Sequence, residues 1–273
     1  FPGLKHIAIV DQAIEKTVLA QSESYGKAVL PTHRYDRAKI IVTLGFDFLS
    51  DSPNPVETAG LFAEAKRLKN GKDMVRTIAF ETYLSMTGAN SDERYRVKNS
   101  DIKAIAIALA KEIAAITHVK LNPNSKQLLN GIDTSSIEAK AHLKSGHILK
   151  LAEELIANKG KGLVVAGGIN AELELLNIVN LINTILGNDG TTIAYGDGGI
   201  LNQAHTLNGT DELLSLLKSG SIKALLIQDV NLAYTLASTT NITALISDVP
   251  FKAGLFTHLN ETASCCSVVL PIH

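Results

Sequence analysis

The residues best suited to ligand chemistry lie in loops that follow apolar runs of strand length. Four such runs end at residues 44, 80, 166 and 228. In open parallel sheets, ligands bind beyond the carboxyl ends of the strands, so these loops are where binding residues are expected. Three of the loops carry a glycine, carboxylates and a carboxamide: Gly45, Asp47, Glu81, Asp92, Asp229 and Asn231.

The remaining loop, Gly167–Gly168, opens a predicted helix whose free backbone N–H groups suit an anion. The commoner role of such a pair is a plain strand-to-helix turn, and Gly196-Asp197-Gly198-Gly199 is likewise typical of a flexible turn. The sequence contains no GxxxxGK[ST] phosphate loop, no GxSxG nucleophile elbow and no HExxH zinc motif. Serine-hydrolase and zinc-protease functions therefore have no support.

Histidines and cysteines give no metal-binding pattern. No two of the eight histidines are four residues apart, the spacing that puts two ligands on one helix face. His33 lies near the start of a predicted strand and His258 lies at the end of one, and for both a surface or strand-edge role competes with a functional one. Cys265 and Cys266 are adjacent, which favours buried small residues over a disulfide or a nucleophile. We therefore expect the chain to bind neither zinc nor an iron–sulfur cluster.

Composition limits the classes of partner. A chain of 273 residues that is 45% hydrophobic and 19% charged is typical of an ordered globular protein. Its net charge of -1 gives no field that attracts nucleic acid or an anionic membrane. The most apolar helical stretch, residues 102–116, is shorter than the ~20 residues that a bilayer span needs, so we expect no direct membrane insertion. A start at Phe1 and an end directly after an apolar run indicate a fragment of a longer protein.

The elements that must position these loops alternate between strands and helices. In the first half, strands are expected at 6–10, 39–44 and 76–80, and helices at 13–25, 56–69 and 100–115. In the second half, helices are expected at 145–158, 171–186 and 211–219, and strands at 162–166, 191–195, 222–228, 244–246, 252–256 and 267–270.

This alternation predicts an α/β protein made of two Rossmann-like parallel-sheet lobes with helices on both faces. Residues 118–147 lose the regular pattern in a polar stretch, and we place the domain boundary there. The expected lobes are residues 1–125 and 140–273.

Two segments of the first half resemble the molybdopterin oxidoreductases of the dimethyl sulfoxide reductase superfamily. The segment from Tyr35 to Glu57 looks like the first cofactor-side loop of that family. Family members then carry Asp-Pro-Arg after a strand, followed by a Thr-Ala pair and an Asp. Here Glu81, Thr87-Gly88 and Asp92 fall at those places without a gap.

The second half continues the resemblance, which covers about residues 35–273. Gln228–Leu232 stands where the family has Gly-Gly-Asn-Pro, and Glu261-Thr262-Ala263 and Val269-Leu270-Pro271 match its Glu-Thr-Ala and Leu-Pro region. Within the superfamily, the sequence around Asp47 and at residues 84–92 is most similar to the large iron–sulfur subunit of alternative complex III. That subunit belongs to a membrane-bound quinol-oxidising complex, and its molybdopterin-like domains are held to have lost the cofactor.

Departures from the family pattern argue against a bound cofactor. Glu81-Thr82-Tyr83 replaces Asp-Pro-Arg, which removes an arginine suited to bidentate phosphate binding. Asp229 replaces a glycine of the family. Glu81 and Asp229 would then both face the position that the cofactor's pyrophosphate occupies in the family. At an effective dielectric of about 20, each unit charge pair ~4 Å apart repels by roughly 4 kcal/mol, enough to weaken binding about a thousandfold.

By resemblance, the chain is expected to be a structural, cofactor-free α/β pair of a bacterial respiratory oxidoreductase subunit. Its partners would be other domains and subunits of the complex, and its location the periplasmic side of the membrane. An alternative is a fragment of an active enzyme that binds molybdopterin guanine dinucleotide through the family-equivalent positions Gly45, Asp47, Glu81, Asp92, Asp229 and Asn231. A third is an unrelated nucleotide- or sugar-binding protein with two α/β lobes.

Overall fold

The chain divides into two compact units, which are described separately. A computed structural model describes residues 3–9, 12–68, 74–168, 171–195, 209–237 and 240–272. The larger unit comprises residues 11–207, and the smaller unit comprises residues 1–10 and 208–273. Both contain parallel sheets flanked by helices, which confirms the predicted α/β class.

A four-stranded parallel sheet of order β4-β3-β2-β5 forms the centre of the larger unit. Its strands are β2 (Ile40–Leu44), β3 (Arg76–Glu81), β4 (Glu93–Arg96) and β5 (Gly162–Ala166). Every residue of β2 and β5 is buried, as expected for parallel strands covered on both faces. A separate antiparallel pair joins β1 (Thr32–His33) to β6 (Ile193–Ala194).

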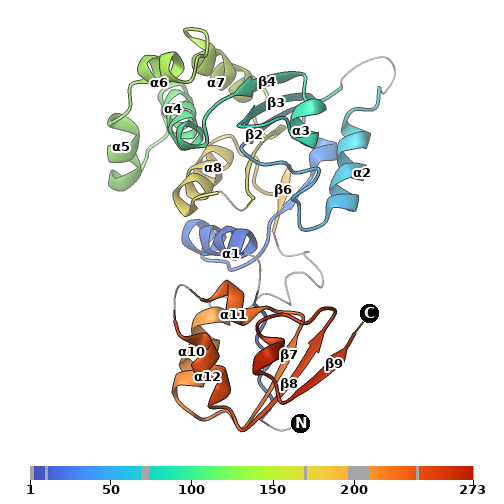
Figure 1. The fold of residues 1–273 in the computed structure, drawn as a ribbon. Coiled ribbons are helices and arrows are strands. Elements are labelled where there is room, and N and C mark those ends of the chain that lie inside the picture. Colours follow the sequence, from blue (N-terminus) through green and yellow to red (C-terminus); the bar gives the residue numbers. More distant parts are fainter. Residues whose placement is uncertain are drawn as a thin grey trace. The chain divides into compact units, whose positions relative to one another are not determined.

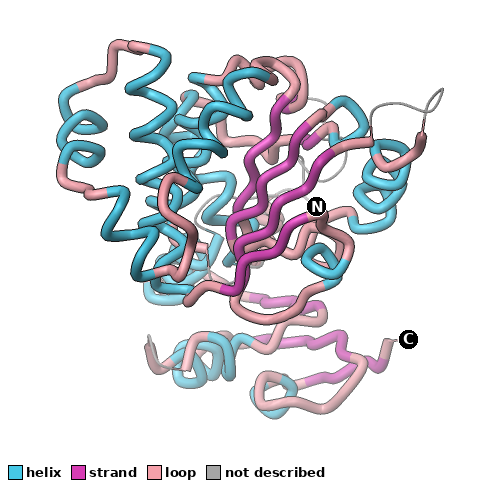
Figure 2. Tube along the Cα trace, turned by 90° about the horizontal axis from the view of Figure 1, so that it is seen from above, coloured by secondary structure: helices cyan, strands magenta, loops and turns pink. Residues whose placement is uncertain are grey.

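Helices cover both faces of this sheet. The helices and 3-10 turn of the unit are α1 (Gln12–Tyr25), η1 (Tyr35–Arg37), α2 (Pro55–Ala65), α3 (Met86–Ala89), α4 (Asn99–Thr117), α5 (Pro123–Asn130), α6 (Thr134–Lys140), α7 (His147–Ala157) and α8 (Leu173–Ile185). On one face, α4, α7 and α8 pack against Val42 and Phe80, and on the other, α2 and η1 pack with Ile41 and Val165. Figure 1 and Figure 2 show the two helical layers on opposite sides of the strands.

Side chains cover the edge of β5 that faces away from β2, where Thr192 bonds the Gly162 carbonyl and Asn183 bonds Val164. Asn183 of α8 is buried, and its carboxamide Nδ2 donates to the carbonyl of Val164 at 2.8 Å while its Oδ1 accepts from the Val164 N–H at 3.1 Å. The same side chain also bonds the Val179 carbonyl and the Asn188 amide. An asparagine therefore satisfies backbone groups that a further strand would otherwise pair.

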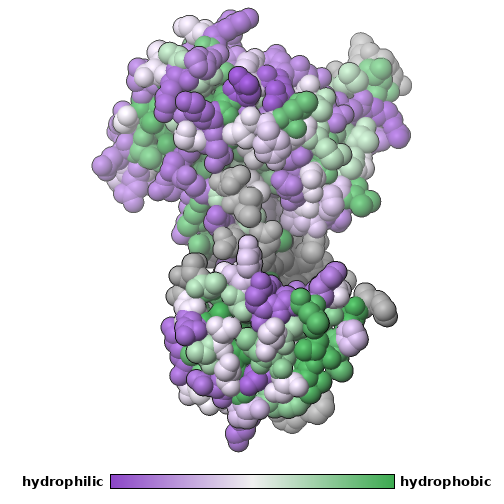
Figure 3. Space-filling view, viewed as in Figure 1, coloured by the Kyte–Doolittle hydropathy of each residue, from purple (hydrophilic) through white to green (hydrophobic). Residues whose placement is uncertain are grey.

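The smaller unit is built on a three-stranded parallel sheet of order β7-β8-β9. Its strands are β7 (Ala224–Gln228), β8 (Phe251–Phe256) and β9 (Val268–Pro271), and its helices are α10 (Gly209–Lys218), α11 (Leu232–Thr235), α12 (Ile242–Ser247) and the 3-10 turn η2 (Ala263–Cys265). The helices pack with Ile227 and Phe256 in one core. Leu226 and Phe251 are exposed, and Figure 3 shows apolar side chains gathered over this sheet. Among the described residues, helices therefore cover both faces of the sheet only in the larger unit.

The predicted domain boundary at 118–147 is wrong. Strand β5, which follows that stretch, pairs with β2, which precedes it, so one sheet contains both predicted halves. The polar stretch forms the short helices α5 and α6, whose first turns are capped by Asn122 and Asp133. Its polar residues reflect a partly solvated helical layer rather than a linker.

Several element predictions also need correction. The strand expected at 244–246 is part of α12, which the side chain of Asn241 caps by accepting from the Ala244 N–H. Residues 6–9 form no strand, and Val10 lies outside the described residues. The strand expected at 191–195 is the two-residue β6. Other predicted helices and strands overlap observed ones, with ends shifted by a few residues.

Candidate functional site

Gly45, Asp47 and Glu81 lie together at the carboxyl edge of the larger sheet. With Tyr83, Gly167 and neighbouring residues, they line a cavity of about 60 Å³. Their convergence agrees with the expectation that loops after parallel strands meet at one edge. The polar groups of these three residues are, however, already used within the protein.

The carboxylate of Asp47 binds the first turn of α3. Its Oδ1 accepts from the Thr87 N–H at 2.9 Å and from the Thr87 hydroxyl at 2.7 Å, and its Oδ2 accepts from the Met86 N–H at 3.2 Å. Free N–H groups at a helix start attract anions, and here an internal carboxylate is that anion. Asp47 therefore stabilises the loop that follows β3.

Glu81 is buried and paired. Its carboxylate accepts from the Ser85 hydroxyl at 2.6 Å and forms an ion pair with the Nε of Arg94 on β4. Gly88 packs so closely against this carboxylate that a β-carbon at position 88 would overlap it. The glycine in the Thr87-Gly88 pair thus makes room for Glu81, whose negative charge is balanced by Arg94.

Asp92 lies at the opposite edge of the same sheet. Its carboxylate accepts from the Thr77 N–H at 2.7 Å, near the start of β3, and pairs with Lys66 at 2.6 Å. Burial alone would raise its pKa, but the bonds from Lys66 and Thr77 outweigh burial and lower it. The predicted grouping of Asp92 with Glu81 is therefore wrong, because the intervening α3 turn carries the chain back to the amino edge of the sheet.

Asp229 and Asn231 belong to the smaller unit. Asp229 has a φ of +48°, a left-handed conformation that favours glycine, as the family glycine at this position suggests. Asn231 donates to Glu261 at 2.7 Å and accepts from the Thr262 hydroxyl at 2.8 Å. The Asn231 side chain therefore connects the loop after β7 to the Glu-Thr-Ala segment.

The strand order places a topological switch point between β2 and β5, because β3 and β4 lie on one side of β2 and β5 on the other. Two side chains fill the crevice there. A β-carbon at Gly167 would lie 2.9 Å from Phe46 Cδ2, and one at Gly45 would lie 2.8 Å from Ile102 Cδ1. The spaces beside Ile102 and Gly45 are about 10 Å³ and 60 Å³, far below the ~300–1,000 Å³ of typical ligand pockets. A larger space borders Phe46 and Gly167.

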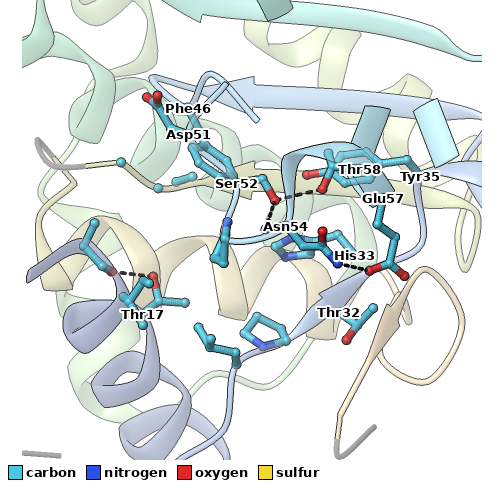
Figure 4. Close-up of a pocket in the computed structure, with 18 of the residues that line it drawn as sticks. Thr17, Thr32, His33, Tyr35, Phe46, Asp51, Ser52, Asn54, Glu57 and Thr58 are labelled. Carbon is cyan, nitrogen blue, oxygen red and sulfur yellow. Dashed lines mark hydrogen bonds between the residues drawn. The ribbon is translucent and has the colours of Figure 1, made fainter. Parts of the chain in front are cut away.

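A larger cavity of about 500 Å³ lies next to this crevice, within the larger unit. Figure 4 shows residues from α1, β1, the β2–α2 loop and α2 arranged around it. Its lining includes the sequence candidates His33, Gly167 and Gly168. Asn54 and Glu57 belong to the segment that the sequence placed at this strand end, but the contribution of α1 was missed, since only the fold brings α1 there.

The imidazole of His33 is half-buried at the wall of this cavity, and burial lowers its pKa to about 4. The ring lies edge-on to Tyr35, with ring centroids 6.0 Å apart. His33 is therefore neutral at neutral pH.

Replacing His33 with glutamine is expected to make the larger unit less sensitive to acid. Because the folded pKa of about 4 lies below the ordinary 6.5, the unfolded chain takes up the proton first as the pH falls. The stability that the folded state keeps with a neutral His33 is therefore fully present above pH 6.5. It is lost progressively as the pH falls to about 4. Between pH 7.5 and 5, His33 accounts for a loss of up to about 2 kcal/mol. Urea unfolding at both pH values measures it, and equal losses in wild type and H33Q would contradict the assignment.

The described residues contain no group of three or more histidines, cysteines or acids able to hold a metal ion. Cys265 and Cys266 are both free thiols, and burial raises the pKa of Cys266. His258 is exposed beside Thr257. Among the described helices, none is long and apolar enough to cross a membrane. Absence of zinc and iron–sulfur binding stays a prediction, which elemental analysis tests.

Comparison with known proteins shows a similar fold. No protein-family model matches the chain, and no curated protein matches it. Among solved structures, it is similar to acetylene hydratase from Pelobacter acetylenicus, with a TM-score of 0.64 at 12% identity over 94% of this chain. The chain spans 44% of that protein. The match shows that this chain shares the fold of that part of acetylene hydratase.

Proposed function

We propose that this chain is the central α/β portion of a molybdopterin-oxidoreductase-like subunit, and that these domains have a structural role without binding the pterin cofactor. The superfamily fold over 94% of the chain supports the architecture. Fold is retained more readily than chemistry, so the fold by itself does not imply a bound cofactor.

The observation that carries the proposal is the filled switch point. In open α/β sheets, the ligand lies in the crevice at the switch point, and backbone glycines allow its phosphates to approach. Here Phe46 lies against Gly167 and Ile102 against Gly45, so the two glycines face side chains of the protein itself. A nucleotide would have to displace both side chains from buried positions.

The charges near the crevice support the same conclusion. Asp47 already occupies the N–H groups of α3, and Glu81 adds a second carboxylate to the same cavity. Tyr83, which stands at the family arginine, is exposed and offers no cation. The Arg94 guanidinium is engaged by Glu81. These groups oppose a doubly anionic pyrophosphate.

The wider role follows from the sequence resemblance. We infer that the subunit acts in a bacterial respiratory electron-transfer complex that oxidises quinol, on the periplasmic side of the membrane. The domains would then hold cluster-bearing domains and partner subunits in place. Pull-down of the full-length subunit from its own membranes, followed by identification of the co-purifying proteins, tests this part of the proposal.

Titration with GDP, which represents the guanine dinucleotide arm, tests the cofactor-free site. Calorimetry should show no binding tighter than about 1 mM to the wild-type chain. The double variant F46G/Y83R removes the ring that fills the crevice and adds a guanidinium, so it should bind GDP more tightly than wild type does. Y83R alone is the matched control and should gain less, because Phe46 still fills the space. Micromolar binding by the wild-type chain would contradict the proposal and favour an active cofactor-binding enzyme.

A further inference from the structure

The 500 Å³ cavity beside the switch point has the size of a small-molecule site. Its walls are mainly apolar, and three of the side chains that form them, Leu30, Tyr35 and Phe46, are buried. Ile14 of α1 and Leu61 of α2 complete the apolar surface from two different helices. Such walls favour a ligand with an apolar body.

Several polar side chains of the lining already have hydrogen-bond partners within the protein. The Thr17 hydroxyl donates to the Ala13 carbonyl at 2.8 Å, and the Ser52 and Thr58 hydroxyls bond each other at 2.8 Å. Asn54 donates to Glu57 Oε2 at 2.6 Å. Figure 4 shows these bonds at the margins of the cavity, with Thr17 on the opposite side from Asn54 and Glu57.

Two titratable groups of the lining, Asp51 and His33, retain free capacity toward a ligand. No hydrogen bond or ion pair joins the Asp51 carboxylate to another described residue, and the imidazole of His33 likewise has no hydrogen-bond partner among them. Asp51 Oδ2 lies 3.7 Å from the position of a β-carbon on Gly168, so the carboxylate faces the end of β5. His33 is neutral, because its burial keeps the imidazole unprotonated, and it adds no positive charge.

The charge of the described lining is negative. It includes the carboxylates of Asp51 and Glu57, and none of its described residues is lysine or arginine. Arg34, on the segment beside His33, is held by Asp36 through two hydrogen bonds of 2.9 and 3.0 Å, and its charge also acts on Glu57. The Asp51 carboxylate has no such counter-charge among the described residues. An anionic ligand would therefore be repelled at this site, and a cationic one attracted.

We propose that this cavity binds a small organic amine, a molecule with an apolar or aromatic body and one protonated nitrogen. The body lies against Ile14, Leu30 and Phe46, and the ammonium lies at the rim beside Asp51, while Glu57 adds negative charge from another side of the cavity (Figure 4). This cavity shares Phe46 and Gly167 with the switch point, but the inference differs from the pterin question because the ligand has the opposite charge.

Two probes of one shape and opposite charge test the proposal. Tryptamine and indole-3-propionate share an indole ring and a two-carbon arm, and end in an ammonium and a carboxylate respectively. In calorimetric titrations of the wild-type chain at pH 7.5, tryptamine should bind at least about tenfold more tightly. Absence of tryptamine binding, or equal affinity for the two probes, would overturn the proposal.

Variants locate the binding and its charge preference. D51N/E57Q should reduce the tenfold preference to about threefold or less while the indole ring still binds. E64Q is the matched control, because Glu64 lies on the same helix outside the lining, and it should leave the preference unchanged. T17F places a ring in the cavity and should abolish binding of tryptamine, whereas retained binding by T17F would overturn the assignment.

Amide chemical-shift mapping on the wild-type chain keeps the test valid if T17F does not fold. Tryptamine should shift the amide resonances of residues 13–17, 30–33, 51–58 and 167–168, which line the cavity. Shifts confined to the smaller unit, or spread over the whole surface, would overturn the proposal.

Discussion

Replacing Glu81 with glutamine should lower the free energy of unfolding of the larger unit by about 2–4 kcal/mol. The carboxylate is buried and accepts from both Ser85 and Arg94. The glutamine amide removes the charge that balances Arg94, and its NH₂ group cannot bond to Arg94, which only donates. Urea unfolding at pH 7, followed by far-UV circular dichroism, measures the change.

The same substitution at Glu93 is the control. Glu93 also forms an ion pair across this sheet, with Arg76, but its side chain is 35% exposed and Arg76 keeps a second partner in Glu154. E93Q should therefore cost less than about 1 kcal/mol. Equal losses in E81Q and E93Q would show that Glu81 is not the buried anchor described above.

Replacing Asn183 with alanine should destabilise the larger unit by about 3–4 kcal/mol. The change leaves the N–H and carbonyl of Val164 without partners at the edge of β5 and removes bonds to Val179 and Asn188. In hydrogen exchange, protection of the Val164 amide should fall more than protection of amides on β3, the strand next to β2 on the far side from β5.

Asn177 provides the comparison on the same helix. Its side chain bonds Glu23 and Ser24 at the surface of the unit. N177A should cost less than about 1 kcal/mol, because water replaces those bonds. A loss in N183A no larger than that in N177A would mean that the edge of β5 is paired in another way.

The sequence pattern predicted the long elements well. Continuous apolar runs at 40–44 and 162–166 became strands buried on both faces, and the helical spacing at 100–115 became α4. Short apolar segments were less informative. The segment Ala244–Ile246 is too short for its periodicity to distinguish a strand from a helix. The Asn241 side chain, which caps the first turn, favours the helix α12.

Domain organisation depended on a contact far apart in the sequence. Pairing of β5 with β2 joins residues more than one hundred positions apart, and nothing in the composition of residues 118–147 indicates it. A polar stretch marks a linker or a solvated pair of short helices equally well. Only the register between Ile40 and Gly162 distinguishes the two.

The candidate site was predictable in part for the same reason. Strand ends indicated that Gly45, Asp47 and Glu81 would converge, because that follows from parallel topology alone. The partners of the carboxylates depended on side-chain packing, which sequence spacing does not encode. The contact of the Phe46 ring with Gly167 and the ion pair of Glu81 with Arg94 are two contacts that depend on this packing.

Pterin and molybdenum analysis of the full-length subunit, purified from its natural host, tests the central claim most directly. Molybdenum is measured by mass spectrometry, and pterin by the fluorescence of its oxidised form. Because Phe46 and Ile102 fill the switch point and Asp47 occupies the N–H groups of α3, we expect neither above background. Stoichiometric molybdopterin guanine dinucleotide, released from the protein on denaturation, would contradict the account.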